Sequence, residues 1–324
     1  MESRTLRSGL SLTGLGFGAA QLGNLARATT DDEAAGAVAA AYDRGIRYFD
    51  TAPHYGLGLS ERRLGAALAA HPRDEFVVST KVGRLIVPND GWDGVARDDE
   101  GFDVPASERR QYDLSRDGIR RSIDESLERL GLDRIDIAYL HDPDAYGPEA
   151  HATAIPALIE LRDEGVVSAV GTGMNQSAMP TEFVLSHDID LVMLAGRYTL
   201  LEQGALDDLL PAAAERGVGI VAAGVYNSGL LSRDRPPVDA RYDYLQAPAE
   251  VIARANAIAD ICEEFGVSLP EAALAFALRH PSVVSVVVGM RTAEQVEQTL
   301  ERRAVDVPDA LWAALVERGL LRDA

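Results

Sequence analysis

Short apolar runs and longer amphipathic segments follow one another in a regular order along this chain. The short runs have the length of β-strands. The longer segments repeat apolar residues every three or four positions, as one face of a helix does. Regular alternation of strand and helix is typical of an α/β domain with a parallel sheet.

Eight strands are predicted, and each is followed by a helical pattern. The strands are 12–20, 47–50, 75–81, 135–141, 166–172, 191–195, 219–223 and 283–288. The helices are 30–44, 60–68, 115–130, 150–164, 181–186, 206–216, 249–265, 270–279, 293–303 and 308–318. Thr30 with Glu33, and Ser268 with Glu271, have the capping-box spacing that starts a helix.

This order predicts one (β/α)8 TIM barrel domain over residues 1–324, because no change of composition divides the chain. Two long rim loops, about 83–113 and 224–247, interrupt the order, and loops of that length are usually functional or disordered. A doubly wound open sheet is the alternative. It is disfavoured because the Gly-rich segment 14–18 opens no helix and has no Gly-x-Gly-x-x-Gly pattern.

The composition limits the kind of partner. A net charge of −20 leaves no basic footprint for nucleic acid and would repel anionic membranes. The single cysteine, Cys262, fits a reducing compartment and is interpreted as a packing residue. No secretory signal or membrane-length apolar run is visible. We therefore expect a soluble, cytoplasmic protein that acts on a small molecule; the oligomeric state stays open.

Four polar side chains lie at or just after predicted strand ends: Asp50, Tyr55, Lys81 and His141. In a β/α barrel the carboxyl ends of the strands share one rim, so these side chains should meet there. A phenol titrates near pH 10, and a nearby ammonium is expected to lower that pKa. The set suits proton transfer to or from an alcohol or carbonyl oxygen, while hydride transfer would need a cofactor.

A second chemistry uses some of the same residues. Asp50, His54, His141 and Asp142 carry oxygen and imidazole ligands that suit Zn²⁺, which would make the protein a metal-dependent hydrolase. This alternative leaves Tyr55 and Lys81 without a function, and it lacks the usual closely spaced pair of histidine ligands. We therefore predict no metal.

The segments around these residues resemble the aldo-keto reductase family, in order, from about residue 12 to about residue 300. The resemblance implies a barrel that binds a nicotinamide cofactor without a Rossmann domain. It also implies that Tyr55 is the acid in reduction and the base in oxidation, tuned by Lys81 and Asp50, with His141 orienting the substrate oxygen. The segments are Phe49-Asp-Thr-Ala-Pro-His-Tyr-Gly56, Ser60-Glu-Arg-Arg-Leu-Gly65, Ser79-Thr-Lys-Val-Gly83 and Tyr139-Leu-His-Asp142.

The same resemblance implies a set of cofactor contacts. Asn175 would hold the carboxamide, Gly229 and Leu230 would cross the pyrophosphate, and the adenosine end would meet Gly289, Arg291, Thr292 and Gln295. Many NADP-preferring members carry Lys and Arg where this chain has Gly289 and Gln295. A 2′-phosphate needs fixed cations, so NAD is favoured over NADP, although Arg291 could still reach a phosphate.

Two segments, 174–176 and 195–201, resemble one branch of the family: aldose dehydrogenases of the L-fucose and D-threo-aldose type, with pyridoxal-type dehydrogenases close by. Met174 and Ala195 depart from the Ser and Gln of many other members. Members of this branch oxidise the anomeric carbon to a lactone. His54 and Trp92 are candidates for the substrate pocket, with loop packing as the alternative for Trp92.

Three other functions remain open. The chain could be an NADPH-dependent reductase of aldehydes or ketones, or a pyridoxal-type dehydrogenase. It could also be a non-catalytic, cofactor-bound regulatory subunit, like the potassium-channel β subunits that share the barrel.

Overall fold

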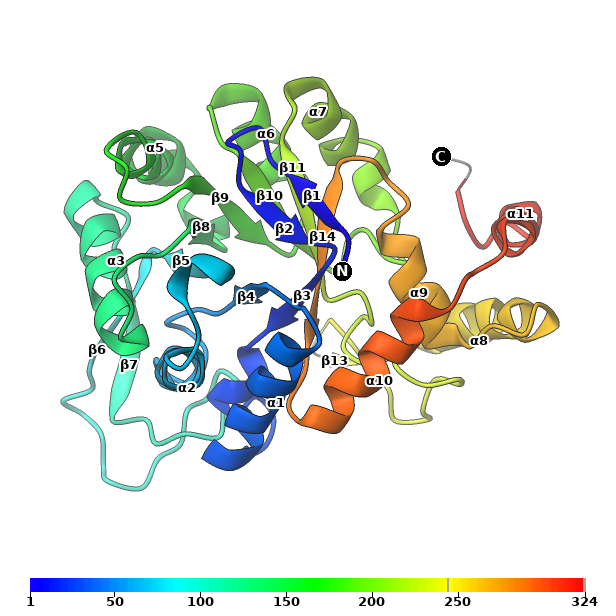
Figure 1. The fold of residues 1–324 in the computed structure, drawn as a ribbon, viewed down its shortest axis with the longest axis horizontal. Coiled ribbons are helices and arrows are strands. Elements are labelled where there is room, and N and C mark those ends of the chain that lie inside the picture. Colours follow the sequence, from blue (N-terminus) through cyan, green and yellow to red (C-terminus); the bar gives the residue numbers. More distant parts are fainter. Residues whose placement is uncertain (244, 323–324) are drawn as a thin grey trace.

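Eight parallel strands close into a barrel, and helices surround it (Figure 1). The computed structural model describes residues 1–243 and 245–322. β14 pairs with β3 and completes the ring, so the predicted TIM barrel is confirmed and the open-sheet alternative is wrong. In spatial order the strands are β3 (Leu15–Gly18), β4 (Tyr48–Asp50), β5 (Val77–Val82), β8 (Ile137–His141), β9 (Ala169–Met174), β10 (Leu191–Ala195), β11 (Gly219–Ala223) and β14 (Val283–Gly289).

The helices lie close to their predicted positions. Both capping boxes are present, at Thr30 with Glu33 and at Ser268 with Glu271. The α-helices are α1 (Asp31–Asp43), α2 (Leu59–Leu68), α3 (Arg116–Leu130), α4 (Gly147–Glu149), α5 (Ile155–Asp163), α6 (Ala178–Ser186), α7 (Leu209–Arg216), α8 (Ala249–Glu264), α9 (Leu269–Ala277), α10 (Ala293–Ala304) and α11 (Asp309–Glu317). A π-helical turn, η4 (Ala150–Ala154), joins α4 to α5, and 3₁₀ turns are η1 (Ala20–Gly23), η2 (Arg73–Glu75), η3 (Asp144–Tyr146) and η5 (Gly204–Leu206).

Three antiparallel hairpins were not predicted. They are β1 (Ser3–Thr5) with β2 (Ser11–Thr13), β6 (Arg84–Pro88) with β7 (Glu108–Tyr112), and β12 (Arg241–Tyr242) with β13 (Leu245–Gln246). The interpretation of 83–113 as irregular throughout is therefore wrong at both of its ends. The sequence Glu-Arg-Arg-Gln-Tyr of β7 has no apolar alternation, so only its pairing with β6 makes it a strand.

The apolar core has two shells. One shell fills the inside of the barrel, where Leu6 and Leu12 of the first hairpin lie against strand residues such as Leu191 and Val221. Because Leu191 is the first residue of β10, this hairpin covers the amino ends of the strands. The larger shell lies between the strands and the helices. The long loops follow the opposite, carboxyl ends of the strands.

The segment 60–65 supports the barrel. Glu61 is fully buried and accepts hydrogen bonds from Thr80 Oγ1 at 2.7 Å and from Arg129 Nε at 2.6 Å. A Cβ on Gly65 would stand 1.8 Å from the carbonyl oxygen of Leu130, so only glycine lets α2 approach α3 this closely. Thr80 directly precedes Lys81 on β5. The contacts of the segment 60–65 therefore hold the strand that carries Lys81.

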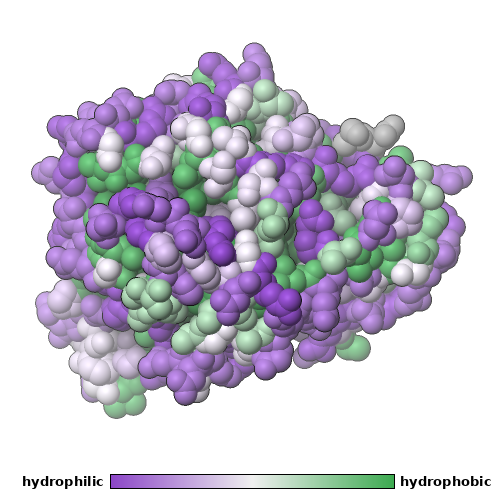
Figure 2. Space-filling view, in the orientation of Figure 1, coloured by the Kyte–Doolittle hydropathy of each residue, from purple (hydrophilic) through white to green (hydrophobic). Residues whose placement is uncertain are grey.

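The surface is polar. Hydrophilic residues cover most of the face shown in Figure 2, with apolar residues scattered among them. Among the described residues, no helix is both long and apolar enough to cross a membrane. Cys262 is buried, and burial raises the pKa of its thiol to about 12, which agrees with a packing role.

Candidate active site

The four predicted residues meet at the carboxyl ends of β4, β5 and β8. Lys81 Nζ donates to Asp50 Oδ2 at 2.7 Å and to the carbonyl oxygen of Thr51 at 2.9 Å. The same ammonium lies 4.7 Å from the centroid of the Tyr55 ring. The His141 ring stands perpendicular to the Tyr55 ring, with centroids 6.0 Å apart. The structure thus brings the four side chains together, while their catalytic roles stay predictions.

Two glycines place the loop that carries Tyr55. A Cβ on Gly56 would stand 2.2 Å from the carbonyl oxygen of Gly23, and Gly56 has a φ of +63°. A Cβ on Gly23 would stand 2.6 Å from the carbonyl carbon of Tyr55. Close contact between these two backbones is therefore possible only for glycine, and it holds the phenol in place over Lys81.

The Asp50–Lys81 pair is almost completely buried, with each side chain about 3–4% exposed. Burial lowers the pKa of Lys81, but Asp50 and Tyr55 outweigh it, so the pKa of Lys81 stands above its ordinary value. Burial also raises the pKa of Asp50, against the opposing effect of Lys81. With both carboxylate oxygens hydrogen-bonded, to Ser79 and to Lys81, the pair is ionised near neutral pH.

Burial also raises the pKa of Tyr55, and the ammonium of Lys81 lowers it by less. The expectation that Lys81 brings the pKa of this phenol below its ordinary value is therefore wrong in net direction. The charge of Lys81 can be inferred from the sequence, whereas removal of the phenolate from water depends on how deeply the folded chain buries it. Tyr55 is thus a neutral phenol near neutral pH, ready to act as an acid.

Two neutral imidazoles lie edge to face beside the phenol. Burial lowers the pKa of His141 well below its ordinary value and lowers that of His54 to about 2. The His54 ring lies 5.3 Å from that of His141 and 5.9 Å from that of Tyr55. His54 Nδ1 is 3.7 Å from Glu100, but a neutral imidazole forms no ion pair. His141 can therefore only donate or accept a hydrogen bond at a substrate oxygen.

The segment between β6 and β7 covers this group. Phe102 packs on His54 and Tyr55, with ring centroids 5.2 and 5.9 Å apart. Arg110 donates to the carbonyl oxygen of His54 at 2.8 Å and pairs with the buried carboxylate of Asp98. Neither Phe102 nor Arg110 was predicted, because an aromatic in a polar loop and an arginine on β7, a strand without apolar alternation, carry no periodic signal.

An ion pair stands next to His141. Arg84 Nη2 donates to Asp142 Oδ2 at 2.8 Å, and that oxygen is 3.6 Å from His141 Nε2. Asp142 adopts a φ of +39°, which is uncommon for a residue other than glycine. Its side chain is 30% exposed, whereas that of His141 is 8% exposed. The pair gives the site a charged donor and a charged acceptor beside the reacting position.

The zinc alternative is not supported. Both carboxylate oxygens of Asp50 are occupied by Ser79 and Lys81. Among the residues that the structure describes, no three His, Cys, Asp or Glu side chains are arranged to hold a metal ion. The predicted pocket wall, Trp92, donates its indole N–H to the carbonyl oxygen of Ala96 at 2.9 Å, within its own loop. Its contact with substrate stays a prediction.

The loop after β11 offers a place for a pyrophosphate. Asn227, Ser228 and Gly229 all have positive φ. The N–H groups of Ser228 and Gly229 donate to no acceptor within the described part of the chain. Consecutive free N–H groups in such a turn form a concave anion site. Leu230 packs in the core and donates its N–H to Asn227, so it contributes mainly to the shape of the turn.

The predicted adenosine end lies between β14 and α10. Thr292 caps α10, and Gln295 Oε1 accepts from the N–H of Arg291 at 2.7 Å. A Cβ on Gly289 would stand 2.3 Å from the amide of Gln21, whose Oε1 is buried without a partner. Asn175 is exposed directly after β9. The free N–H groups and the unpaired amide oxygen fit a polar, phosphate-bearing cofactor, and these contacts stay predictions.

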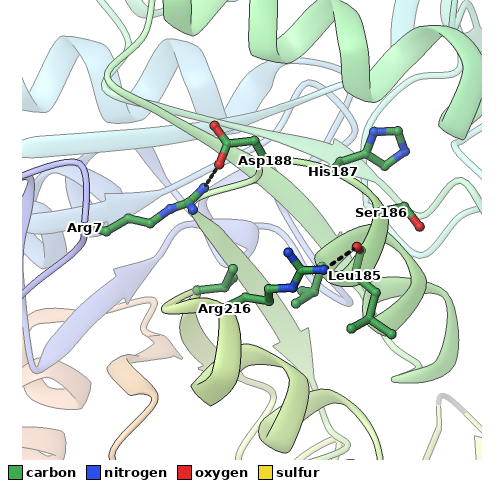
Figure 3. A pocket seen from close by; sticks show the side chains of 8 residues that line it. Arg7, Leu185, Ser186, His187, Asp188 and Arg216 are labelled. Atoms are coloured by element: carbon green, nitrogen blue, oxygen red, sulfur yellow. Dashed lines mark hydrogen bonds and ion pairs between the residues drawn. The ribbon is translucent and has the colours of Figure 1, made fainter.

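A separate cavity of about 320 Å³ lies at the opposite end of the barrel. Its lining includes His187 and Asp188, which precede β10, and Val218, which precedes β11. Figure 3 shows Arg7 bonded to Asp188 and Arg216 bonded to the carbonyl oxygen of Leu185. None of the predicted site residues lines this cavity, so it belongs to a different face of the molecule.

Side chains suited to proton transfer at the carboxyl rim of a (β/α)8 barrel, next to loops that fit a phosphate-bearing cofactor, are typical of one class of enzyme: the oxidoreductases. The chain belongs to the Aldo/keto reductase family, whose sequence model matches residues 14–318. That match covers the barrel and every predicted site residue. The predicted family is thereby confirmed.

Individual relatives agree with this assignment. The chain is 52% identical over 322 residues to D-threo-aldose 1-dehydrogenase of Pseudomonas sp, covering 99% of this chain and 98% of that protein. It is 39% identical to pyridoxal 4-dehydrogenase of Microbacterium luteolum, covering 99% and 98%. An aldo-keto reductase from Bacillus halodurans, solved in its holo form, superposes with a TM-score of 0.77 at 26% identity, covering 100% and 97%.

Proposed function

We propose that this protein oxidises an aldose at its anomeric carbon to a lactone, with NAD as hydride acceptor. The observation that carries the proposal is the nearly full-length, 52% identity with D-threo-aldose 1-dehydrogenase. The Arg84–Asp142 pair beside His141 supports it, because a sugar presents hydroxyl groups that need charged donors and acceptors.

The side chains divide the reaction between them. The bound nicotinamide would accept a hydride from the anomeric carbon. Tyr55 takes the proton of the anomeric hydroxyl, and Lys81, held by Asp50, offsets the negative charge of the phenolate. His141 orients the same oxygen by a hydrogen bond, as a neutral imidazole. The segment around Phe102 shields the group from water.

A substrate and cofactor panel tests this function. Reduced nicotinamide is followed by absorbance while aldoses, pyridoxal and aromatic aldehydes are offered with NAD or NADPH. We expect oxidation of D-threo-configured aldoses to be the fastest reaction. Turnover of pyridoxal alone, or reduction of aldehydes with NADPH alone, would replace the proposal with one of those activities. No turnover with any of them would favour a regulatory subunit.

The direction of the Tyr55 shift predicts the pH dependence. Oxidation needs the phenolate, so its rate is low below the pKa of Tyr55 and rises as the pH approaches that value. Because burial raises this pKa, oxidation should keep rising up to about pH 10, the ordinary value for tyrosine, without a plateau. Reduction needs the neutral phenol and should be nearly constant from about pH 6 to 8. A plateau of the oxidation rate near pH 7 would contradict this assignment.

The choice of NAD follows from how Arg291 is used. Its guanidinium donates to the carbonyl oxygens of Arg27 and Leu25 and to Thr29 Oγ1, and the residue is 7% exposed. A guanidinium that already donates to three protein acceptors has few N–H groups left to bind a 2′-phosphate. Gly289 and Gln295 add no charge, so the adenosine end favours the cofactor that lacks this phosphate.

A single added cation should therefore shift this preference. In Gln295→Lys we expect kcat/KM for NADP to rise about tenfold relative to NAD, because a charge-assisted hydrogen bond to phosphate contributes about 1.5–3 kcal/mol. Gln298→Lys, one turn further along α10, adds the same charge farther from the cap and serves as control. An equal change in both variants would show a general charge effect, not a contact with the phosphate.

A further inference from the structure

A chain of hydroxyl groups runs through the inside of the barrel beneath the active site. Tyr139 Oη lies 3.0 Å from Tyr48 Oη, which lies 3.1 Å from Ser79 Oγ. Ser79 Oγ lies 2.7 Å from Asp50 Oδ1. The three hydroxyl-bearing residues are completely buried, and they come from three neighbouring strands, β8, β4 and β5. None of them belongs to the predicted catalytic group.

The direction of this chain is fixed by its end. An ionised carboxylate can only accept hydrogen bonds, so the Ser79 hydroxyl must donate to Asp50. Ser79 Oγ has then used its only proton, so it must accept from Tyr48. By the same argument Tyr48 accepts from Tyr139. All three hydroxyls therefore point their protons toward Asp50, and hydrogen bonds aligned in this way strengthen one another.

We propose that Tyr139, Tyr48 and Ser79 are positioning residues that hold Asp50 as the anion that anchors Lys81 beside Tyr55. Asp50 Oδ2 accepts from Lys81, whereas Asp50 Oδ1 accepts from Ser79. The hydrogen bond from Ser79 therefore draws negative charge toward Oδ1 and away from the oxygen that binds the ammonium. A less tightly held ammonium is freer to stabilise the phenolate of Tyr55. The proposal rests on the acid–base role of Tyr55. It adds that three core residues, Ser79, Tyr48 and Tyr139, influence Tyr55 through Asp50 and Lys81.

The two tyrosines are suited to this task because they stay neutral. Burial raises the pKa of Tyr48 and of Tyr139 far above the working range, so both remain donors. Apolar side chains such as Ile137 and Val287 fill the rest of this interior. The hydroxyl chain is thus a polar path through a mainly apolar interior, and each buried hydroxyl on it has a partner.

Other charged groups around the site would stay unchanged if the chain were cut. Tyr55 faces Lys81, Asp50 and, on the loop after β8, Asp142. His141 faces Arg84 and Arg110 of the β6–β7 hairpin, along with Lys81 and the neutral His54. Removing a hydroxyl from the chain alters none of these charges. A change in pH dependence would therefore report on Asp50 and the groups that it holds.

The test is a series of variants that remove one hydroxyl each: Ser79→Ala, Tyr48→Phe and Tyr139→Phe. Without a donor, Asp50 draws Lys81 more strongly and the phenolate is less stable. For Ser79→Ala we expect the rising limb of oxidation to move about half a pH unit toward alkaline pH, equivalent to about a threefold lower rate at fixed pH. The shift should shrink in the order Ser79, Tyr48, Tyr139.

Two measurements separate this effect from damage to the fold. Reduction at a given pH should fall by the same factor as oxidation, because the equilibrium constant fixes the ratio of the two directions. The affinity for the cofactor should match that of the wild type in all three variants, whereas damage to the barrel rim would weaken it. The double variant Ser79→Ala with Tyr139→Phe should shift no further than Ser79→Ala alone, because the chain is already cut. Tyr42→Phe removes a phenol that donates to Glu75 from α1, outside the barrel, and should shift nothing.

The outcomes are distinct. A graded alkaline shift of the oxidation profile with unchanged cofactor affinity supports the chain. Unchanged profiles in all three variants, or losses that are accompanied by weaker cofactor binding, would overturn it. If Tyr55→Phe retains full activity, the acid–base assignment of Tyr55 is wrong. That single variant therefore distinguishes failure of the assignment from failure of the hydroxyl chain. Failure to turn over aldoses does not affect the test, which can use any alcohol that the protein oxidises.

Discussion

Replacing Tyr55 by phenylalanine should reduce kcat about a thousandfold while leaving cofactor affinity within about a factor of two. A positioned acid or base contributes 10²–10⁴ to the rate, and no other nearby group is placed to replace Tyr55. Asp50 holds the ammonium of Lys81, and burial keeps both imidazoles neutral, so neither is a cationic acid. Cofactor affinity should persist because the predicted phosphate contacts lie on the loop after β11 and at α10.

The measurement is single-turnover oxidation together with a binding titration of the cofactor. Tyr42→Phe is the matched control, because it removes a phenol hydroxyl on the outer side of the barrel, where the hydroxyl donates to Glu75. Retention of more than a tenth of the wild-type kcat in Tyr55→Phe would contradict the assignment. A parallel loss of cofactor affinity would instead point to a displaced loop, since the Tyr55 backbone lies against Gly23.

Much of this fold could be predicted because the signals are local. The strands of the barrel are buried and apolar, so their runs appear in the sequence, and β10 and β11 fall at the predicted residues. Convergence of Asp50, Lys81 and His141 follows from barrel geometry once the strand ends are known. The capping boxes were predictable for the same reason, since their partners are three residues apart.

What escaped prediction depends on contacts between distant segments. β7 is a strand only because β6 pairs with it, and Phe102 joins the site only because the chain folds back over Tyr55. The net pKa direction of Tyr55 required knowing how deeply the phenol is buried. The hydroxyl chain beneath Asp50 could not be seen in the sequence at all, because tyrosines on separate strands give no common pattern.

The second large effect concerns the Asp50–Lys81 pair. Lys81→Met keeps the length of the side chain but leaves the carboxylate of Asp50 buried without its cation. Removing one partner of a buried ion pair costs about 3–5 kcal/mol of stability, so we expect the free energy of unfolding to fall by that amount. Turnover should fall at least a hundredfold as well, because the phenolate of Tyr55 loses its neighbouring charge.

The double variant Asp50→Asn with Lys81→Met separates these two effects. With both charges gone, most of the lost stability should return, since a neutral amide can still accept from Ser79. Activity should not return, because no ammonium faces Tyr55. Denaturant unfolding and oxidation kinetics measure the two quantities.

The pH dependence of unfolding gives a further check on the single variant. In Lys81→Met the pKa of Asp50 in the folded protein rises further above its unfolded value. Folding then favours the protonated carboxyl, so the stability penalty is smallest below the unfolded pKa of about 4, grows as the pH rises toward the folded value and levels off above it. A penalty that is the same at pH 5 and pH 8 would mean that Asp50 is not the buried charge that Lys81 balances, and that the ammonium acts on Tyr55 alone.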